Sequence, residues 1–178
     1  MPAAVSSAFD VAYWFADTAL NDNEYLQPQK LHRLLFLAQA FFAVAYKGRR
    51  LMPGTFVADE MGPLEPNLFV AMSKGRPDLD VDLFLPEEVE TFLDRIWRRF
   101  GHMTVDSLNR ICRNSSAYKR AYAKGKRAVI PLDAMRLSFA RGESAPTVAK
   151  VAGDKVRRTQ TGRPVKITAW RPPSHDGS

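Results

Sequence analysis

The sequence predicts a compact multi-helix domain, mostly α, with a short extended element and a flexible C-terminal tail. Hydrophobic residues make up 46% of the 178 positions and aromatic residues 11%, values typical of folded globular proteins. Apolar residues recur at helical spacing through most of residues 1–142. Residues 143–178 contain seven basic and three acidic residues, four prolines and one aromatic residue, Trp170. This tail offers too little apolar surface to offset an ordering cost of about 1–2 kcal/mol per residue, so we place the domain boundary between 142 and 143.

Two helices are predicted near the N-terminus. Ser7 is followed three positions later by Asp10, the arrangement of a capping box, and apolar residues then recur up to Leu20. Pro28 suits the first turn of a second helix, which Gly48 ends. Apolar residues lie on most sides of this second segment, so we predict that it is central and enclosed by its neighbours.

The middle of the chain begins with an extended element. Residues 54–58 are short, apolar and partly β-branched, which predicts a strand. Gly62-Pro63 predicts a turn, and Pro66 predicts a short helix that continues to Met72. Pro86 begins an amphipathic helix with three glutamates in its first turn and three arginines toward its end, an order that complements the helix dipole.

Three more helices are predicted in the remainder of the domain. Thr104 can cap the first of them, and either Ser115 or Ser116 can cap the second. The last runs from Leu132 to Phe139. The predicted domain therefore contains far more helix than strand.

Two segments of the chain resemble the motifs of a known family. Residues 28–39 read PQKLHRLLFLAQ, and residues 58–66 read ADEMGPLEP. In this order and at this distance they are similar to the signature of the Panacea antitoxin domain, the SocA-like family of phage and bacterial proteins. The resemblance covers residues 9–139 and places the family motif at Lys30, Leu31, Leu34, Ala38, Gln39, Ala58, Gly62, Pro63 and Pro66.

The resemblance implies an antitoxin that binds a protein toxin and acts as a proteolytic adaptor, delivering the toxin to the ClpXP protease. The expected partners are then a cognate toxin and the ClpX unfoldase. The motif residues also have structural interpretations. A role in shaping a turn is favoured for Gly62-Pro63 and Pro66. Lys30 is either a helix-start residue or pairs with Asp59 or Glu60.

Charge is segregated along the predicted domain. Residues 77–94 contain seven acids and no base, whereas residues 110–127 contain seven bases and no acid. If both segments are exposed, the surface is polarised and can orient a partner. Alternatively, the opposite charges pair within the fold. The candidate partner-binding residues are Arg110, Arg113, Lys119, Arg120, Lys124, Lys126 and Arg127.

The basic segment also allows a nucleic-acid interpretation, because Tyr118 and Tyr122 lie between its cations and aromatic rings can stack on bases. Tyrosines four positions apart on a helix more often face the core. The alternative function is thus a DNA-binding antitoxin that regulates its own gene through residues 110–127.

Catalysis, metal binding and a cofactor are not expected. His32, His102 and His175 do not have the spacing of a ligand pair, and Cys112 has apolar neighbours at helical spacing, which favours packing over reactivity. Asp59 and Glu60 have no third group to complete an acid–base site. The single cysteine and the lack of an 18-residue apolar run favour a cytoplasmic protein that does not span a membrane.

The tail carries a candidate docking segment. After Val165, apolar residues alternate with basic or polar ones, so an extended chain presents Val165, Ile167 and Ala169 on one face. The segment resembles the basic, apolar tails by which some adaptors tether to ClpX, or it is a nonspecific basic tail or a linker that pairs back onto the domain. The candidate tether residues are Arg163, Pro164, Val165, Ile167 and Trp170.

Overall fold

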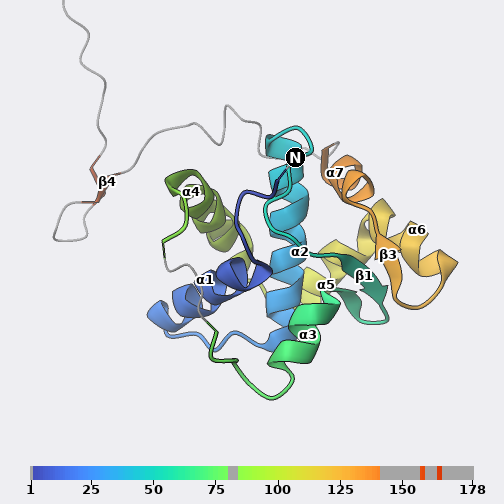
Figure 1. Cartoon of the computed structure of the whole chain (residues 1–178), viewed down its shortest axis with the longest axis horizontal. Coiled ribbons are helices and arrows are strands. Elements are labelled where there is room, and N and C mark those ends of the chain that lie inside the picture. The colour runs from blue at the N-terminus through green and yellow to red at the C-terminus, as the bar shows by residue number, and fades with distance from the viewer. Residues whose placement is uncertain (1, 80–83, 141–156, 159–163, 166–178) are drawn as a thin grey trace, which may run out of the picture.

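A computed structural model of the chain describes residues 2–79, 84–140, 157–158 and 164–165 (Figure 1). The helices are α1 (Ala8–Asn21), α2 (Pro28–Ala45), α3 (Pro66–Met72), α4 (Glu87–Ile96), α5 (Val105–Asn114), α6 (Ser116–Lys124) and α7 (Leu132–Ala140), and a π-helical segment, η1 (Trp97–Gly101), continues α4. The strands are β1 (Phe56–Asp59), β2 (Gly62–Leu64), β3 (Ala128–Ile130), β4 (Arg157–Arg158) and β5 (Pro164–Val165). The predicted mostly helical fold is confirmed.

Helix α2 is the axis of the domain, as predicted. Pro28 occupies its first turn, and every residue from 31 to 43 is buried. It stands at the centre of Figure 1, with α1 and α4 on one side and the small sheet, α6 and α7 on the other. A helix that is enclosed on all sides accepts apolar residues around its whole circumference, which explains the lack of a polar stripe in this segment.

The predicted N-termini of α1, α5 and α6 are also confirmed. The hydroxyl of Ser7 accepts a hydrogen bond from the backbone of Phe9, and the carboxylate of Asp10 accepts one from the backbone of Ser7. Thr104 caps α5, and Ser115 rather than Ser116 caps α6. These caps satisfy backbone N–H groups that lack partners within the helix, so the sequence marks where these three helices begin.

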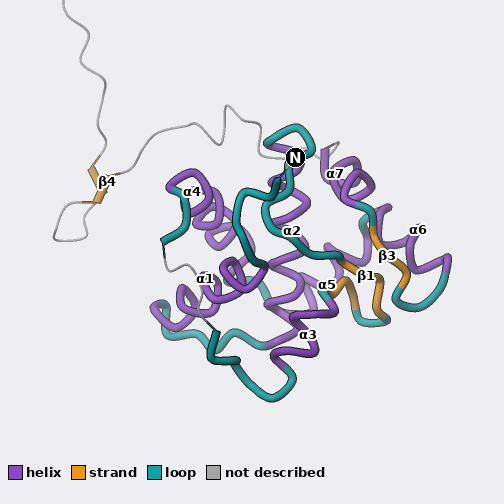
Figure 2. Tube along the Cα trace, in the orientation of Figure 1, coloured by secondary structure: helices purple, strands orange, loops and turns teal. Residues whose placement is uncertain are grey.

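The small sheet differs in one respect from the prediction. Its order is β2-β1-β3 with antiparallel pairing, and Figure 2 shows its strands in orange. Ala58 of β1 lies opposite Pro63 of β2. The tight turn falls on Glu60 and Met61, so the prediction of a turn at Gly62-Pro63 is wrong: these residues begin the returning strand. Proline is tolerated there because β2 is an edge strand, where its missing N–H leaves no ladder bond unmade. Strand β3 was not predicted.

Two parts of the predicted tail are described. Arg157 pairs with Val165 and Arg158 with Pro164 in a ladder of two short strands, β4 and β5. Pro164 and Val165 of the candidate tether therefore lie in β5, while Arg163, Ile167, Trp170 and the predicted boundary at 142–143 lie outside the described residues. Among the described helices, we find none with the length and hydropathy of a transmembrane span.

Candidate partner-binding site

A groove opens between α5, α6 and the turn of the β1–β2 hairpin. Its volume is about 570 Å³, within the range of about 300–1,000 Å³ that is common for ligand sites. It is lined by Met61 from the hairpin turn, by Asp106, Asn109, Arg110, Arg113 and Asn114 from α5, and by Tyr118, Lys119, Tyr122 and Ala123 from α6. We call this the basic groove, because three cations face one carboxylate in its lining.

The α5 wall of the basic groove follows from helical periodicity. Its lining residues recur at i, i+3, i+4, i+7 and i+8, so they share one face of the helix. Leu108 and Cys112 point into the core instead and are fully buried. Burial of this apolar edge holds α5 in place and leaves Arg110 and Arg113 exposed at the surface.

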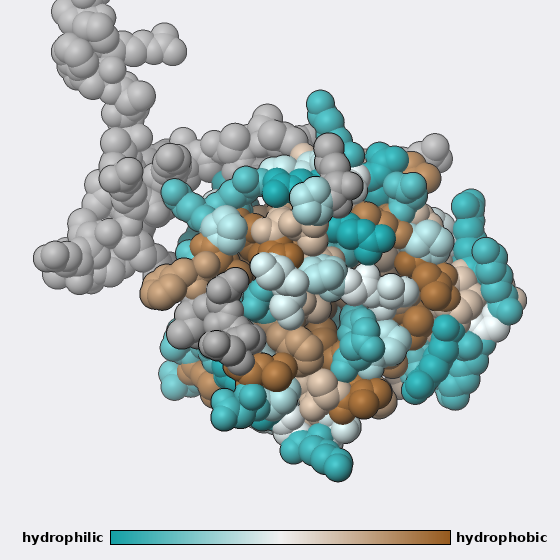
Figure 3. All heavy atoms as spheres, in the orientation of Figure 1, coloured by the Kyte–Doolittle hydropathy of each residue, from teal (hydrophilic) through white to brown (hydrophobic). Residues whose placement is uncertain are grey.

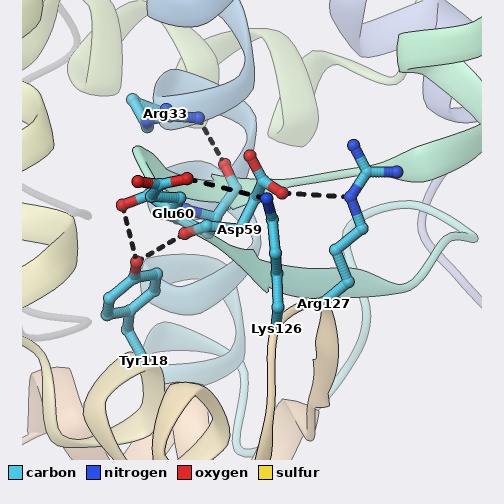
Figure 4. A network of polar contacts seen from close by, with 7 residues as sticks. Arg33, Asp59, Glu60, Tyr118, Lys126 and Arg127 are labelled. Carbon is cyan, nitrogen blue, oxygen red and sulfur yellow. Dashed lines mark hydrogen bonds and ion pairs between the residues drawn. The ribbon is translucent and has the colours of Figure 1, made fainter.

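The α6 wall presents a stacked pair of tyrosines. The rings of Tyr118 and Tyr122 lie 5.6 Å apart and are nearly parallel, at 9°. Tyr118 is buried, whereas Tyr122 is 41% exposed, so the expectation of a core-facing pair holds for only one of the two. The Tyr118 hydroxyl donates to the backbone carbonyl oxygen of Asp59 at 2.5 Å (Figure 4). Burial raises the pKa of Tyr118, and the positive charge of Arg113 partly opposes this rise.

Behind the groove, Arg33 of α2 connects its two sides. Arg33 Nε donates to Oδ1 of Asn109 at 2.7 Å, and Arg33 Nη1 donates to the carbonyl oxygen of Pro63 at 2.6 Å. The guanidinium is buried, and burial lowers its pKa. One side chain thus ties α5 and β2 to the central helix. Sequence reasoning missed Arg33, although a basic residue in a helix that is predicted to be enclosed by its neighbours is a signal for a buried polar contact.

Two cations at the end of the basic segment 110–127 form ion pairs with the β1–β2 hairpin (Figure 4). Arg127 Nε lies 3.0 Å from Oδ1 of Asp59, and Lys126 Nζ lies 3.6 Å from Oε2 of Glu60. The interpretation that basic residues pair within the fold is therefore correct for these two. Their partners are the hairpin acids, not the acidic segment 77–94.

Four other cations of the segment are exposed and lack ion pairs with the residues that the structure describes. Within the described part of the chain, Arg110, Lys119, Arg120 and Lys124 make no ion pair, and all four are exposed. Arg110 and Lys119 line the groove, whereas Arg120 and Lys124 lie outside it. In Figure 3, hydrophilic side chains gather along the right margin of the molecule, where Figure 1 shows α6 and β3. The candidate partner-binding residues thus have different surroundings: Lys126 and Arg127 pair with the hairpin acids, three cations line the groove, and two lie outside its lining.

The residues that carry the family resemblance lie in α2, in the β1–β2 hairpin and at the start of α3. Leu31, Leu34 and Ala38 are buried in α2, Ala58 is buried in β1, and Pro66 occupies the first turn of α3. Buried Gln39 accepts from the backbone of Leu51 and Met52 and donates to the carbonyl of Met52, which fixes the segment that leads into β1.

Lys30 lies away from the hairpin. Its Nζ is 3.5 Å from Oε2 of Glu24 and 5.9 Å from the ring centroid of Trp97. The alternative prediction that Lys30 pairs with Asp59 or Glu60 is therefore wrong, and Arg33, one helical turn further on, approaches the hairpin instead.

The two side chains of α2 and α5 that were considered for metal binding or reactivity, His32 and Cys112, are buried. Burial lowers the pKa of His32 to about 4, and its Nδ1 accepts a hydrogen bond from the backbone of Glu65 at 3.2 Å. Burial raises the pKa of Cys112 to about 12, so its thiol is protonated and packed, as predicted. Within the described residues, no three His, Cys, Asp or Glu side chains are grouped to hold a metal ion.

Comparison of the chain with protein-family models, with curated proteins and with solved structures gives no match. The resemblance to the Panacea domain therefore rests on the two sequence motifs.

Proposed function

We propose that this chain is an antitoxin that binds a protein toxin and presents it to the ClpXP protease. The proposal is supported by the resemblance of residues 28–39 and 58–66 to the Panacea motifs. In the fold, these two segments lie against each other, because Arg33 in the first donates to the carbonyl oxygen of Pro63 in the second. The motifs thus belong to one packed unit, which is what a domain signature requires.

The observation that carries a binding role is the basic groove. Arg110 and Lys119 have no ion pair within the described residues, and exposed Met61 and Tyr122 lie in the same lining. Exposed arginine, tyrosine and methionine are enriched in protein interfaces. Arg33 and Tyr118 hold the hairpin against α5 and α6, so the groove is preformed and little ordering cost remains for binding.

Delivery to the protease is assigned to the tail. In this proposal, the segment around Val165, Ile167 and Trp170 docks to ClpX while the helical domain holds the toxin. A flexible connection between two binding modules raises the local concentration of one at the other, to about the millimolar range for a short linker. Binding and delivery are then separable functions of one chain.

The first test is toxin binding. Affinity capture from the native cell, followed by identification of the retained proteins, should yield a small protein that arrests growth when expressed alone. Co-expression of the full chain should relieve this arrest. If the captured proteins do not affect growth, or if the chain does not relieve the arrest, the antitoxin proposal is rejected.

The second test is delivery, measured as toxin turnover by purified ClpXP. Replacing Val165, Ile167 and Trp170 with serine should slow turnover strongly and leave toxin affinity nearly unchanged. A chain that ends after Gly142 should behave in the same way. The matched control replaces Thr159, Thr161 and Thr168 with alanine and should keep full turnover. Equal turnover by all four proteins would reject the tail as the tether.

A second candidate function is operator binding. It is supported by four exposed cations without ion pairs in the described chain, Arg110, Lys119, Arg120 and Lys124. A gel-shift assay with the DNA upstream of the gene would test it. This function would be favoured over the first if the DNA shows a specific mobility shift that depends on all four cations and if no toxin is captured.

A further inference from the structure

We propose that the basic groove binds an extended, acidic segment of the partner protein, and that one aromatic or large apolar side chain of this segment packs against Tyr122 and Met61. This inference rests on the proposed function, since it names the part of a protein partner that the groove takes. It commits to a peptide rather than to a nucleic acid.

The charge of the lining favours carboxylates. Arg110, Arg113 and Lys119 line the groove, against the single carboxylate of Asp106. Arg110 and Lys119 have no ion pair with any residue that the structure describes, so their charge is available to a ligand. An arginine fork can hold a carboxylate with two parallel hydrogen bonds, which gives an acidic side chain a defined position.

The dimensions of the groove favour a short extended segment. Helix α5 has 10 residues and is therefore about 15 Å long, at about 1.5 Å per residue. An extended peptide rises about 3.3 Å per residue, so about four residues lie along the wall. A partner helix of the same length, with a diameter of about 10–12 Å, would occupy about 1,200 Å³ or more, about twice the 570 Å³ of the groove.

An apolar anchor is favoured by two exposed side chains. Met61 is 49% exposed at the hairpin turn, and Tyr122 is 41% exposed on α6. The ring of Tyr118 stacks on Tyr122, and the exposed part of Tyr122 remains available to a ligand. Tyrosine offers apolar area at low entropic cost, and methionine adapts its shape to what it contacts.

The same lining argues against a nucleic acid. Single strands bind along grooves where successive bases stack on aromatic rings, whereas here Tyr118 is buried beneath Tyr122. Lys126 and Arg127 are engaged by Glu60 and Asp59, which shortens the row of available cations.

A peptide-binding experiment tests the inference directly. The probe is a fluorescein-labelled peptide with one tryptophan between two short runs of glutamate and aspartate, and binding to the full chain is followed by fluorescence anisotropy at low salt. The site variant is Arg110→Glu with Lys119→Glu. Its matched control is Arg120→Glu with Lys124→Glu, which changes the net charge equally at exposed positions outside the groove.

The site variant should weaken peptide binding about tenfold or more, and the control less than about threefold. Replacing the tryptophan of the probe with glycine should also weaken binding to the unaltered chain, and Tyr122→Ala should remove this difference. Rising salt should lower the affinity, because the attraction is electrostatic and solvent-exposed.

Three results of the binding assays would overturn the inference. They are an equal loss in the two double variants, no binding of the acidic probe by the unaltered chain, and tighter groove-dependent binding of a labelled single-stranded oligonucleotide than of the peptide. If the site variant still captures the toxin, the inference is also wrong, but the proposed function stands. If the unaltered chain captures no toxin, the proposed function fails independently of the peptide result.

Discussion

Gly62 lies directly against the guanidinium of Arg33. A Cβ atom at position 62 would be 2.5 Å from Nε of Arg33, and the backbone of Gly62 has φ of 143°. Arg33 in turn donates to Asn109 and to the carbonyl oxygen of Pro63. The absence of a side chain at position 62 therefore allows one buried arginine to hold the hairpin and α5 together.

Gly62→Ala should destabilise the domain by displacing Arg33 from its two acceptors. Gly125→Ala is the matched control, because Gly125 has a similar φ of 148° but a Cβ atom added there would meet nothing within 4 Å. Backbone strain is common to both variants, whereas the clash is confined to Gly62. Urea unfolding should show an additional loss of about 1–3 kcal/mol for Gly62→Ala. Equal losses would show that Arg33 tolerates the added methyl group.

Arg33→Lys should also cost stability, although it keeps the positive charge. Lysine has a single ammonium group and cannot reproduce the fixed geometry with which Arg33 reaches Asn109 and Pro63. A buried acceptor then loses its donor, and we expect a loss of about 2–3 kcal/mol. Arg98→Lys provides the comparison, since Arg98 makes an exposed ion pair with Asp94 and its replacement should change stability by less than about 0.5 kcal/mol. Similar effects at the two positions would contradict a structural role for Arg33.

Leu34→Ala tests the central position of α2. Leu34 has no exposed surface, so its truncation should leave a cavity and lower the free energy of unfolding by about 2–5 kcal/mol. Leu137→Ala on α7 removes the same atoms from a side chain that is 53% exposed, and the loss should be below about 1 kcal/mol. Thermal or urea unfolding of the two variants provides the measurement. A small effect of Leu34→Ala would mean that α2 is not enclosed.

His32 should make the domain less stable as the pH falls below about 6.5. Its pKa is about 4 in the folded chain because it is buried, and about 6.5 in an unfolded chain. Between these values the unfolded state binds the additional proton, so lowering the pH favours unfolding, and the loss is complete once the pH falls through the folded pKa. Between pH 7.5 and pH 5, this group should contribute a loss of about 2 kcal/mol. The unfolding free energy of His32→Gln should lack this contribution, and parallel pH profiles for the two proteins would refute it.

Local sequence signals predicted the helices well, because each signal acts within a few residues. The capping box of Ser7 and Asp10 and the first-turn proline at position 28 satisfy or remove backbone donors at the residue where a helix begins. The same local reasoning was wrong at Gly62-Pro63. A glycine and a proline commonly form a turn, but here glycine is required by the contact with Arg33, 29 positions earlier in the chain.

The basic groove could be predicted only in part. The cations of residues 110–127 and the tyrosines among them are visible in the sequence, and helical periodicity places several on one face. The sequence does not show that Lys126 and Arg127 pair with the hairpin acids, whereas Arg110 and Lys119 line the groove. That distinction depends on where the β1–β2 turn lies relative to α6.

The sequence by itself determined that α2 is enclosed, where the helices begin, and that residues 110–127 are rich in positive charge. Hydrophobic periodicity and caps are short-range properties, so they can be read without knowing the fold. Only the tertiary structure decided that Arg33 joins Asn109 and Pro63, which are 76 and 30 positions away, and that Met61 and Tyr122 line the same groove. These arrangements depend on the packing of several elements at once, because a buried polar group must find its partners wherever the fold brings them.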